Sequence, residues 1–348
     1  MSGALQGRSR FWDAARGVAI LAVIWIHMPT GASFQGGEHA WNFDYWIASR
    51  QFLNFPVALF LFLAGYFVKP QRVTPPGLWL RGRIKRLLIP YLIWTSVYGL
   101  AEVAQDPGSL QRPFELLGQI IIGSVAAHLY FVVVLIQLTV LTPLLVKAAA
   151  QRWGSVLFSV TPVYVAFMYW FAFATGDLPE LYNYFFPAWF AFYYGGIWVR
   201  VRGVKAFSTR ISIMAVAIAA VVSVVEAYWL LSVSMTTGFA ASQLKVSSIL
   251  YAFAVIALVL SWHKLKPDAG VPGLVYLGER SYGIYFVHMI WIMGFGFMVE
   301  RLHLFEALPV LPAIQVVGIA LVLGLSVASI SITRKLISKK YAAHLLGF

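Results

Sequence analysis

The sequence contains no cysteine. This absence excludes disulfide bonds, Cys-ligated zinc, iron–sulfur clusters and a thiol nucleophile together. Charged residues are also scarce: they make up 11% of the 348 residues, whereas 60% of the residues are hydrophobic and the mean hydropathy is +0.78. A soluble protein of this length needs far more charge, because its surface must face water. The composition therefore excludes a soluble globular protein.

The apolar residues come in blocks of roughly 17–24, close to the length that crosses about 30 Å of hydrocarbon. We therefore predict an all-α polytopic membrane protein with about ten transmembrane helices in a single domain, residues 1–348. The predicted spans are approximately 14–30, 51–68, 88–104, 127–146, 155–174, 184–199, 211–232, 245–262, 277–297 and 309–332. An apolar stretch at 114–125 is too short to span and predicts a re-entrant or interfacial segment.

The net charge of +13 would suit a nucleic-acid-binding protein, but the distribution of charge excludes that interpretation. With the N-terminus inside, nearly all Lys and Arg residues fall at inner helix ends and loops, while most Asp and Glu residues lie outside or within helices. The basic residues left for the outer side are Arg50, Arg112, Lys245 and Arg301. This is the positive-inside pattern, so both termini are predicted to be cytoplasmic. The expected partners of the positive charge are membrane lipids, not nucleic acid.

The first span carries two ionisable residues, which are costly in lipid and are functional candidates for that reason. Arg16 and His27 lie three helical turns plus about 20° apart, so they share one face at a separation of about 16 Å. Asp13 can orient the Arg16 guanidinium from three residues away. Arg16 could hold a phosphate, and His27 could act as a general base. The alternative is that Arg16 snorkels to headgroups and His27 bonds a neighbouring helix.

The span at 277–297 carries a polar stripe, because Ser281, Tyr285 and His288 recur at i, i+4 and i+7. Such a stripe predicts either interhelical hydrogen bonds or a lined cavity. His128 and Tyr130, with the aromatic run at 182–187, fit an aromatic belt at the outer interface. His128 could also contact an acceptor there. No metal-binding or nucleotide-binding motif is present, so no metal site is expected.

Five motifs in order resemble the acyltransferase-3 family of bacterial membrane O-acyltransferases, and the likeness covers nearly the whole chain. The first is the Asp13-x-x-Arg16-Gly17 opening, in which Arg16 and His27 also reproduce the family's Arg/Lys-x10-His spacing. The other four are Pro56-Val-Ala-Leu-Phe-Leu-Phe-Leu-Ala64-Gly65-Tyr66, Arg83-Ile-Lys-Arg86-Leu-Leu-Ile-Pro90, His128-Leu-Tyr130-Phe and Ser281-Tyr282-Gly-Ile-Tyr285-Phe-Val-His288. Ala64 stands where the family commonly has Ser, which makes catalysis there unexpected. Tyr130 stands where Trp is usual.

The resemblance implies an O-acetyltransferase of the bacterial cytoplasmic (inner) membrane. It would move an acetyl group from cytoplasmic acetyl-CoA to a hydroxyl of a cell-surface polysaccharide or its lipid-linked precursor. Acetyl-CoA is then a donor substrate, and no permanently bound cofactor is implied. A larger acyl group, and either direct transfer or an acyl-His27 intermediate, remain open. The alternative function is a glycan or lipid carrier, or flippase, without acyl transfer.

The same resemblance assigns roles to residues. His27 is the predicted catalytic residue, with Arg16 and Asp13 supporting it. The predicted donor-binding residues are Arg16, Arg83, Arg86, Ser281 and Tyr285, and the predicted acceptor-binding residues are His128, Tyr130 and His288. Some family members carry an additional periplasmic hydrolase-like domain, which is not expected here. Transfer would then be completed within the membrane domain or with a partner, either a second copy of the chain or polysaccharide-synthesis proteins.

Overall fold

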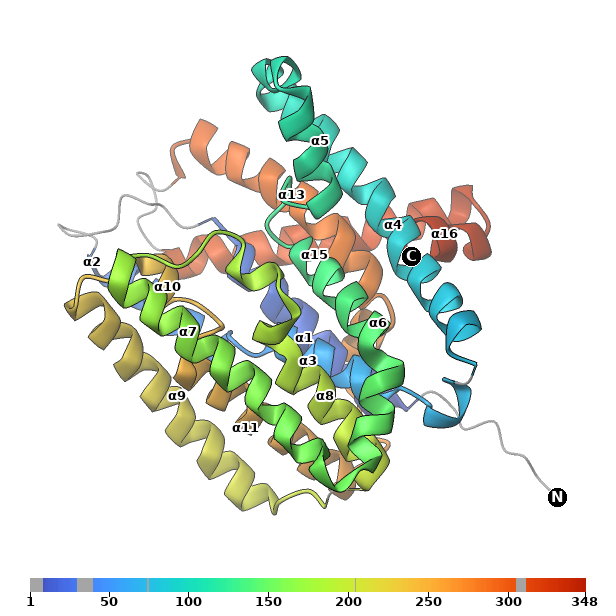
Figure 1. The fold of residues 1–348 in the computed structure, drawn as a ribbon. Coiled ribbons are helices and arrows are strands. Elements are labelled where there is room, and N and C mark those ends of the chain that lie inside the picture. Colours follow the sequence, from blue (N-terminus) through green and yellow to red (C-terminus); the bar gives the residue numbers. More distant parts are fainter. Residues whose placement is uncertain (1–8, 30–39, 74, 204, 305–310) are drawn as a thin grey trace.

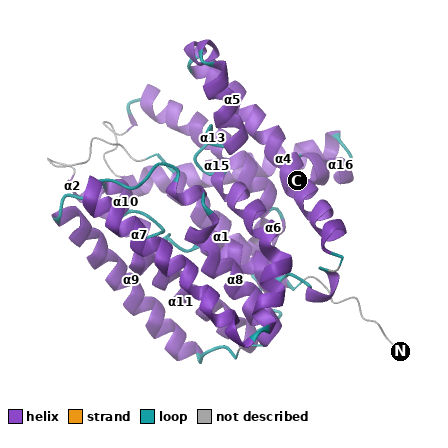
Figure 2. Ribbon diagram, in the orientation of Figure 1, coloured by secondary structure: helices purple, strands orange, loops and turns teal. Residues whose placement is uncertain are grey.

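The structure is a computed structural model that describes residues 9–29, 40–73, 75–203, 205–304 and 311–348. These residues form a bundle of α-helices joined by loops and short 3-10 helices, and they contain no β-strand (Figures 1 and 2). The helices α1 (Arg10–His27) and α3 (Pro56–Tyr66) lie near the centre of the bundle in Figure 1. The prediction of an all-α protein is therefore confirmed.

The remaining helices surround this pair. In chain order they are α2 (Ala40–Phe52), α4 (Pro76–Gln105), α5 (Pro113–Ile122), α6 (Tyr130–Ala150), α7 (Val160–Thr175), α8 (Phe186–Arg202), α9 (Thr209–Ser232), α10 (Thr237–Ala240), α11 (Val246–Leu265), α12 (Pro272–Glu279), α13 (Ser281–Arg301), α15 (Leu311–Leu336) and α16 (Lys339–Leu345). Each predicted span overlaps one of the helices α1, α3, α4, α6, α7, α8, α9, α11, α13 and α15, and α4 begins 12 residues before the predicted start at 88. Residue 30, the end of the first predicted span, lies outside the described ranges, and so do residues 309–310 at the start of the last one.

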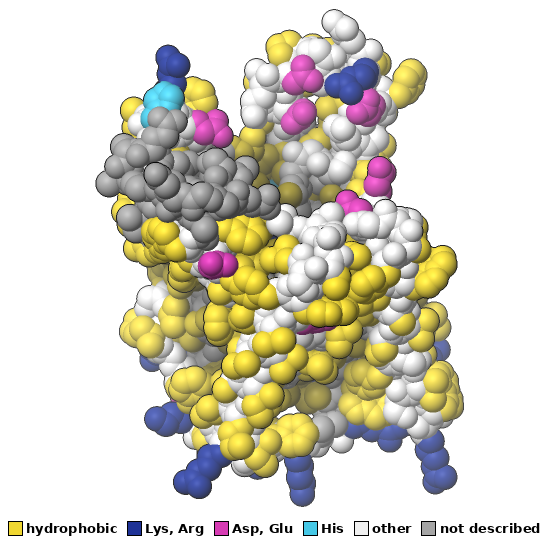
Figure 3. Space-filling model, turned by 90° about the vertical axis from the view of Figure 1, so that its left-hand side faces the viewer, with side chains coloured by type: hydrophobic (Ala, Val, Ile, Leu, Met, Phe, Trp, Pro, Cys, Tyr) yellow, Lys and Arg dark blue, Asp and Glu magenta, His cyan; other side chains and the backbone are white. Residues whose placement is uncertain are grey.

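Among the described residues, eight helical stretches are long and apolar enough to cross a membrane. The other two predicted spans are α1, with 18 residues, and α8, with 17. A continuous run of α8, from Ala188 to Ile197, is buried, so this helix contacts protein and not lipid. On the face drawn in Figure 3, apolar side chains form a band, most Lys and Arg lie at one end and most Asp and Glu toward the other. By the positive-inside rule we assign the basic end to the cytoplasm.

The second predicted span, 51–68, is wrong at its start. Helix α2 ends at Phe52, and Pro56 begins the separate helix α3. Proline lacks a backbone N–H, so it fits the first turn of a helix but cannot donate the hydrogen bond that would continue a helix from α2. The chain therefore breaks between the two helices. As a result, residues 40–50 are helical instead of forming a polar outer loop, and Arg50 lies in the last turn of α2.

The predicted span 277–297 is also broken, because α12 ends at Glu279 and α13 begins at Ser281. Helix α12 lies directly against α1. A Cβ atom on Gly17 would collide with the carbonyl oxygen of Leu274, and a Cβ atom on Gly278 would collide with that of Asp13. Glycine thus allows the two backbones to touch, as small residues do between membrane helices. This contact fixes α1 beside the start of α13.

A second close contact joins α3 to α8. A Cβ atom on Gly65 would meet the carbonyl oxygen of Tyr193, and one on Gly196 would meet that of Phe62. The hydrophobic effect contributes little between helices in lipid, so this close van der Waals packing is what holds the pair together. The two contacts position α1 and α3, the helices that line the site described below.

The apolar stretch predicted at 114–125 forms α5, which has 10 residues and is too short to span a membrane. It lies at the end of α4, away from the centre of the bundle (Figure 1). Its apolar side chains are exposed; Phe114 reaches 89%. Such a face suits the membrane interface. Whether the segment is re-entrant or interfacial stays a prediction.

The α3–α8 contact can be tested with a single added methyl group. Replacing Gly196 by Ala forces the two backbones apart, and we expect a loss of stability of about 1–3 kcal/mol. The measurement is the thermal unfolding midpoint of the purified protein in detergent. Gly324→Ala is the matched control, because nothing lies within 4 Å of a Cβ atom at that position of α15. Equal midpoints for both variants would contradict the close contact.

Candidate active site

A cavity of about 170 Å³ opens near the basic end of the bundle and is lined by Arg16, Arg83 and Arg86. Arg16 is held in place, since its Nη1 lies 3.0 Å from Oδ1 of the buried Asp13. The Arg16 guanidinium also lies over the ring of Phe67, with Cζ 5.0 Å from the ring centre. The structure thus brings together the three arginines predicted to bind the donor, and it confirms that Asp13 orients Arg16.

A second cavity, of about 190 Å³, adjoins the first, because Arg16, Leu63 and Ala64 line both. Ser281 and Tyr285 lie in its wall. The Ser281 hydroxyl donates to the carbonyl oxygen of Gly278 at 2.9 Å, which ties the first residue of α13 to α12. The polar stripe therefore lines a cavity at Ser281 and Tyr285, one of its two predicted roles, while Ser281 also forms a local hydrogen bond.

A third cavity, of about 200 Å³, lies beyond the second and shares Phe60, Phe131 and Tyr285 with it. His27 lines this cavity. Arg50 and His128 also line it, and the rest of the wall combines aliphatic residues such as Val23 and Leu244 with aromatic and neutral polar residues: Tyr130, Tyr182, Asn183, Trp189, Ser242 and Gln243. Three adjoining cavities therefore lead from the three arginines at the basic end to His27. Arg16 and His27 face the first and the last of them.

Three histidines from separate parts of the chain meet at the third cavity. The ring centres of His27 and His288 are 5.6 Å apart, those of His128 and His288 are 5.0 Å apart, and those of His27 and His128 are 6.4 Å apart. His128 and His288 are buried, whereas His27 is partly accessible where it lines the cavity. Within the described ranges no group of three His, Asp or Glu side chains is arranged to hold a metal ion.

His288 lies behind the other two rings. Its Nδ1 is 2.7 Å from the carbonyl oxygen of Tyr285 and 3.1 Å from that of Ile284, so Nδ1 must carry a hydrogen and donate it. In the neutral ring the Nε2 atom then carries the lone pair, and it has no hydrogen-bond partner among the described residues. His288 does not line the cavity wall, so its predicted acceptor contact stays a prediction. Its geometry suits a role in orienting His27 and His128.

His128 and Tyr130 are not part of an aromatic belt, and that prediction is wrong. Both are buried, at 2% and 8% exposure, and both face the third cavity. The Tyr285 hydroxyl donates to the carbonyl oxygen of His128 at 2.6 Å, and the Tyr130 ring stacks on Trp189 with centres 5.9 Å apart. These interactions connect α13, α6 and α8. The motif therefore points into the protein and not toward the membrane surface.

Arg50 is a residue of the site that the sequence did not reveal. It was placed among the outer-side basic residues with no role. In the structure it lines the third cavity with His27, and its Nη1 donates to the carbonyl oxygen of Ile26 at 2.7 Å. Its Nε is buried without a partner among the described residues. The sequence signal that could have found it is a single charged residue, Arg50, just before the apolar run that starts at Pro56. The break in the helix before Pro56 concealed that Arg50 belongs to a separate helix, α2.

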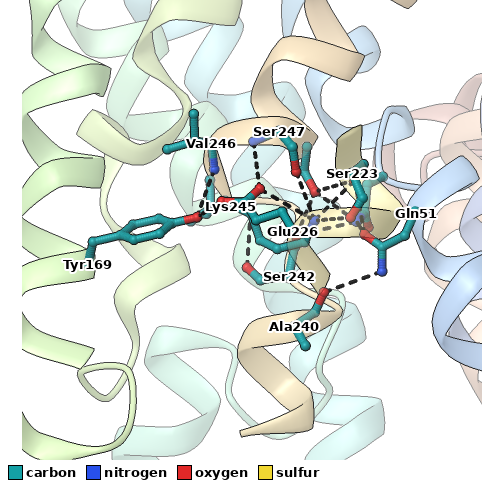
Figure 4. A network of polar contacts seen from close by, with 12 residues as sticks. Gln51, Tyr169, Ser223, Glu226, Ala240, Ser242, Lys245, Val246 and Ser247 are labelled. Carbon is teal, nitrogen blue, oxygen red and sulfur yellow. Dashed lines mark hydrogen bonds and ion pairs between the residues drawn. The ribbon is translucent and has the colours of Figure 1, made fainter. Parts of the chain in front are cut away.

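Lys245 is likewise buried within the protein, and Glu226, whose side chain is 15% exposed, lies beside it. Lys245 is 0% exposed; its Nζ donates to Ser223 at 3.2 and 3.0 Å and to Ser247 at 3.1 Å, and lies 3.9 Å from a Glu226 oxygen. Glu226 also accepts from Tyr169 and from the backbone of Ser247 (Figure 4). This network holds the chain just after Ser242 and Gln243 of the cavity wall.

The fold and these cavities form a candidate active site that is basic at one end and lined with histidine at the other. Comparison with protein families matches the acyltransferase-3 family, described as an acyltransferase domain, over residues 9–331. The chain belongs to this family and is a multi-pass membrane acyltransferase. Comparison with curated proteins and with solved structures gives no match.

The buried network predicts a stability effect. Replacing Lys245 by Met leaves the Ser223 carbonyl without its donor and Glu226 without its nearby cation, and we expect a loss of about 1–3 kcal/mol. The thermal unfolding midpoint in detergent measures it. Lys264→Met is the control and should leave the midpoint unchanged, because Lys264 is exposed near the end of α11, the helix that Lys245 precedes. A Lys245→Met protein as stable as the control would show that the network contributes nothing.

Proposed function

We propose that this protein transfers an acetyl group from cytoplasmic acetyl-CoA to a hydroxyl of a cell-surface polysaccharide, or its lipid-linked precursor, in the bacterial cytoplasmic membrane. The observation that supports this most directly is the series of adjoining cavities from Arg16, Arg83 and Arg86 to His27. A donor that carries phosphates at one end and a thioester at the other fits such a passage. The family match supports acyl transfer in general.

The first cavity provides the chemistry for the donor. Arginine binds phosphate through parallel N–H groups, and three arginines around one opening match the several phosphates of CoA. Arg83 and Arg86 are exposed at the start of α4, where they can contact a nucleotide that stays outside the bundle. The thioester arm would then extend past Ala64 and Tyr285 toward His27.

The third cavity provides the chemistry for the acceptor. Aromatic rings such as Trp189 and Tyr130, with the neutral hydrogen-bonding groups of Asn183, Ser242 and Gln243, resemble the mixed lining that suits a sugar. His27 is the accessible histidine of the cluster, so it is the proposed general base for the acceptor hydroxyl. Proton transfer to His27 would make that oxygen nucleophilic toward the thioester carbon.

The proposal is tested with purified protein in lipid nanodiscs, radiolabelled acetyl-CoA and de-O-acetylated surface polysaccharide from the bacterium that naturally produces this protein. We expect label in the polysaccharide and one free CoA per ester formed. Free CoA can be titrated with a thiol reagent without background, because the chain has no cysteine. Movement of glycan or lipid across reconstituted vesicles with no CoA release would instead support the carrier function and contradict the proposal.

Replacing His27 by Gln should abolish acetyl transfer while leaving membrane insertion and thermal stability near those of the parent protein. The physical reason is that Gln preserves polarity in the cavity but cannot accept the hydroxyl proton. A fall in the rate of at least about 10²-fold is expected. His344→Gln, exposed in α16, is the matched control and should retain full activity. Full acetylation by His27→Gln would exclude His27 as the base.

Arg83→Gln and Arg86→Gln should each raise the KM for acetyl-CoA by about tenfold or more, because a charge-assisted hydrogen bond to phosphate is lost. The KM for S-acetylpantetheine, which lacks the nucleotide and its phosphates, should not change. Arg81→Gln is the control, since Arg81 lies on the same helix but does not line the first cavity. If the KM values for acetyl-CoA and S-acetylpantetheine rise equally, the arginines do not recognise the phosphates.

A further inference from the structure

We infer that Arg50 stabilises the negative charge that develops on the thioester carbonyl oxygen during transfer. This role rests on the proposed function and adds to it a catalytic residue that the sequence motifs do not include. Two observations carry it. Arg50 and His27 line the same cavity of about 200 Å³, and the buried Nε of Arg50 has no partner among the described residues.

Arg50 is anchored beside His27 by the backbone. Its Nη1 donates to the carbonyl oxygen of Ile26 at 2.7 Å, and Ile26 directly precedes His27 at the end of α1. This bond fixes the guanidinium relative to the histidine although the two side chains come from different helices. A rigid donor placed before the reaction starts needs no reorganisation when charge appears, which is the basis of oxyanion stabilisation.

The charge of Arg50 is not balanced by the cavity wall. The described residues that line the third cavity include no Asp or Glu, and no ion pair is formed by Arg50 among the described residues. Its buried Nε also lacks an acceptor. A buried donor without a partner is unfavourable, and it becomes favourable when an anion forms next to it. An oxyanion at the reacting carbon meets that requirement.

The reaction step is balanced as follows. The acceptor oxygen bonds to the thioester carbon, its proton passes to His27, and the carbonyl π electrons move to oxygen beside the Arg50 guanidinium. The carbon–sulfur bond then breaks, the carbonyl reforms, and the CoA sulfur takes the proton from His27. An ester and free CoA result, and no further reactant is needed. Arg50 contacts the oxyanion only between the two steps, so it lowers the barrier more than it strengthens donor binding.

The test uses hydrolysis of acetyl-CoA, with water as the acceptor, alongside transfer to de-O-acetylated polysaccharide. Oxyanion stabilisation does not depend on the acceptor, so Arg50→Gln should lower kcat for both reactions by about 10²- to 10³-fold and leave the KM for acetyl-CoA unchanged. Arg50→Lys keeps the positive charge but not the planar guanidinium, so its kcat should lie between those of the parent protein and Arg50→Gln. Arg112→Gln is the matched control, because Arg112 is an exposed outer-side arginine paired with Glu115.

Four results would overturn the assignment. If Arg50→Gln impairs transfer with a raised acceptor KM but leaves hydrolysis intact, Arg50 binds a permanent anion on the acceptor. If Arg50→Gln and Arg50→Lys both lose activity together with a lowered unfolding midpoint and weaker acetyl-CoA binding, the role is structural. If the parent protein releases no CoA at all, the proposed function itself fails and this role with it. If Arg50→Gln is as active as an active parent protein, only the role of Arg50 is overturned.

Discussion

The absence of water from the hydrocarbon layer is the constraint on which this structure depends, because every polar group there must find a partner within the protein. Lys245 and Glu226 satisfy it through serine and tyrosine side chains. The Nε of Arg50 and both ring nitrogens of His128 do not, since they are buried without hydrogen-bond partners among the described residues. Polar groups of the first kind stabilise the fold. Arg50 and His128 both line the third cavity, which is where a substrate would complete them.

Backbone contacts at glycine determine where that cavity lies. Helix α1 touches α12 at Gly17 and Gly278, and α3 touches α8 at Gly65 and Gly196. Bulkier residues would separate these helices and widen the space between them. Helix α1 carries Arg16 and His27 on the same succession of cavities, while α3 contributes apolar side chains to all of them. The packing of small residues, with little help from the hydrophobic effect in lipid, therefore sets the width of the path to the histidines.

The sequence predicted the features that depend on local signals. Hydropathy and loop charge located the helices, and the spacing of Arg16 and His27 along one helix placed both on the cavity side. Features that depend on tertiary contacts were missed. The broken helix before Pro56 concealed Arg50, and burial of Lys245 required serine side chains from other helices. His128 looked interfacial because it lies at the start of a predicted span, but Tyr98 and Tyr285 from distant parts of the chain enclose it.

The size of the cavities bears on how a large donor could react inside so narrow a bundle. Each cavity has a volume of 170–200 Å³, below the roughly 300 Å³ of typical ligand pockets. A nucleotide is too wide for such a passage, but the narrower pantetheine arm with its thioester is not. In the proposed reaction the nucleotide would therefore stay at the exposed Arg83 and Arg86 while only the arm enters. The acyl group could then reach His27 without the nucleotide ever crossing the membrane, so acyl transfer across the bilayer would not require a carrier for the whole donor.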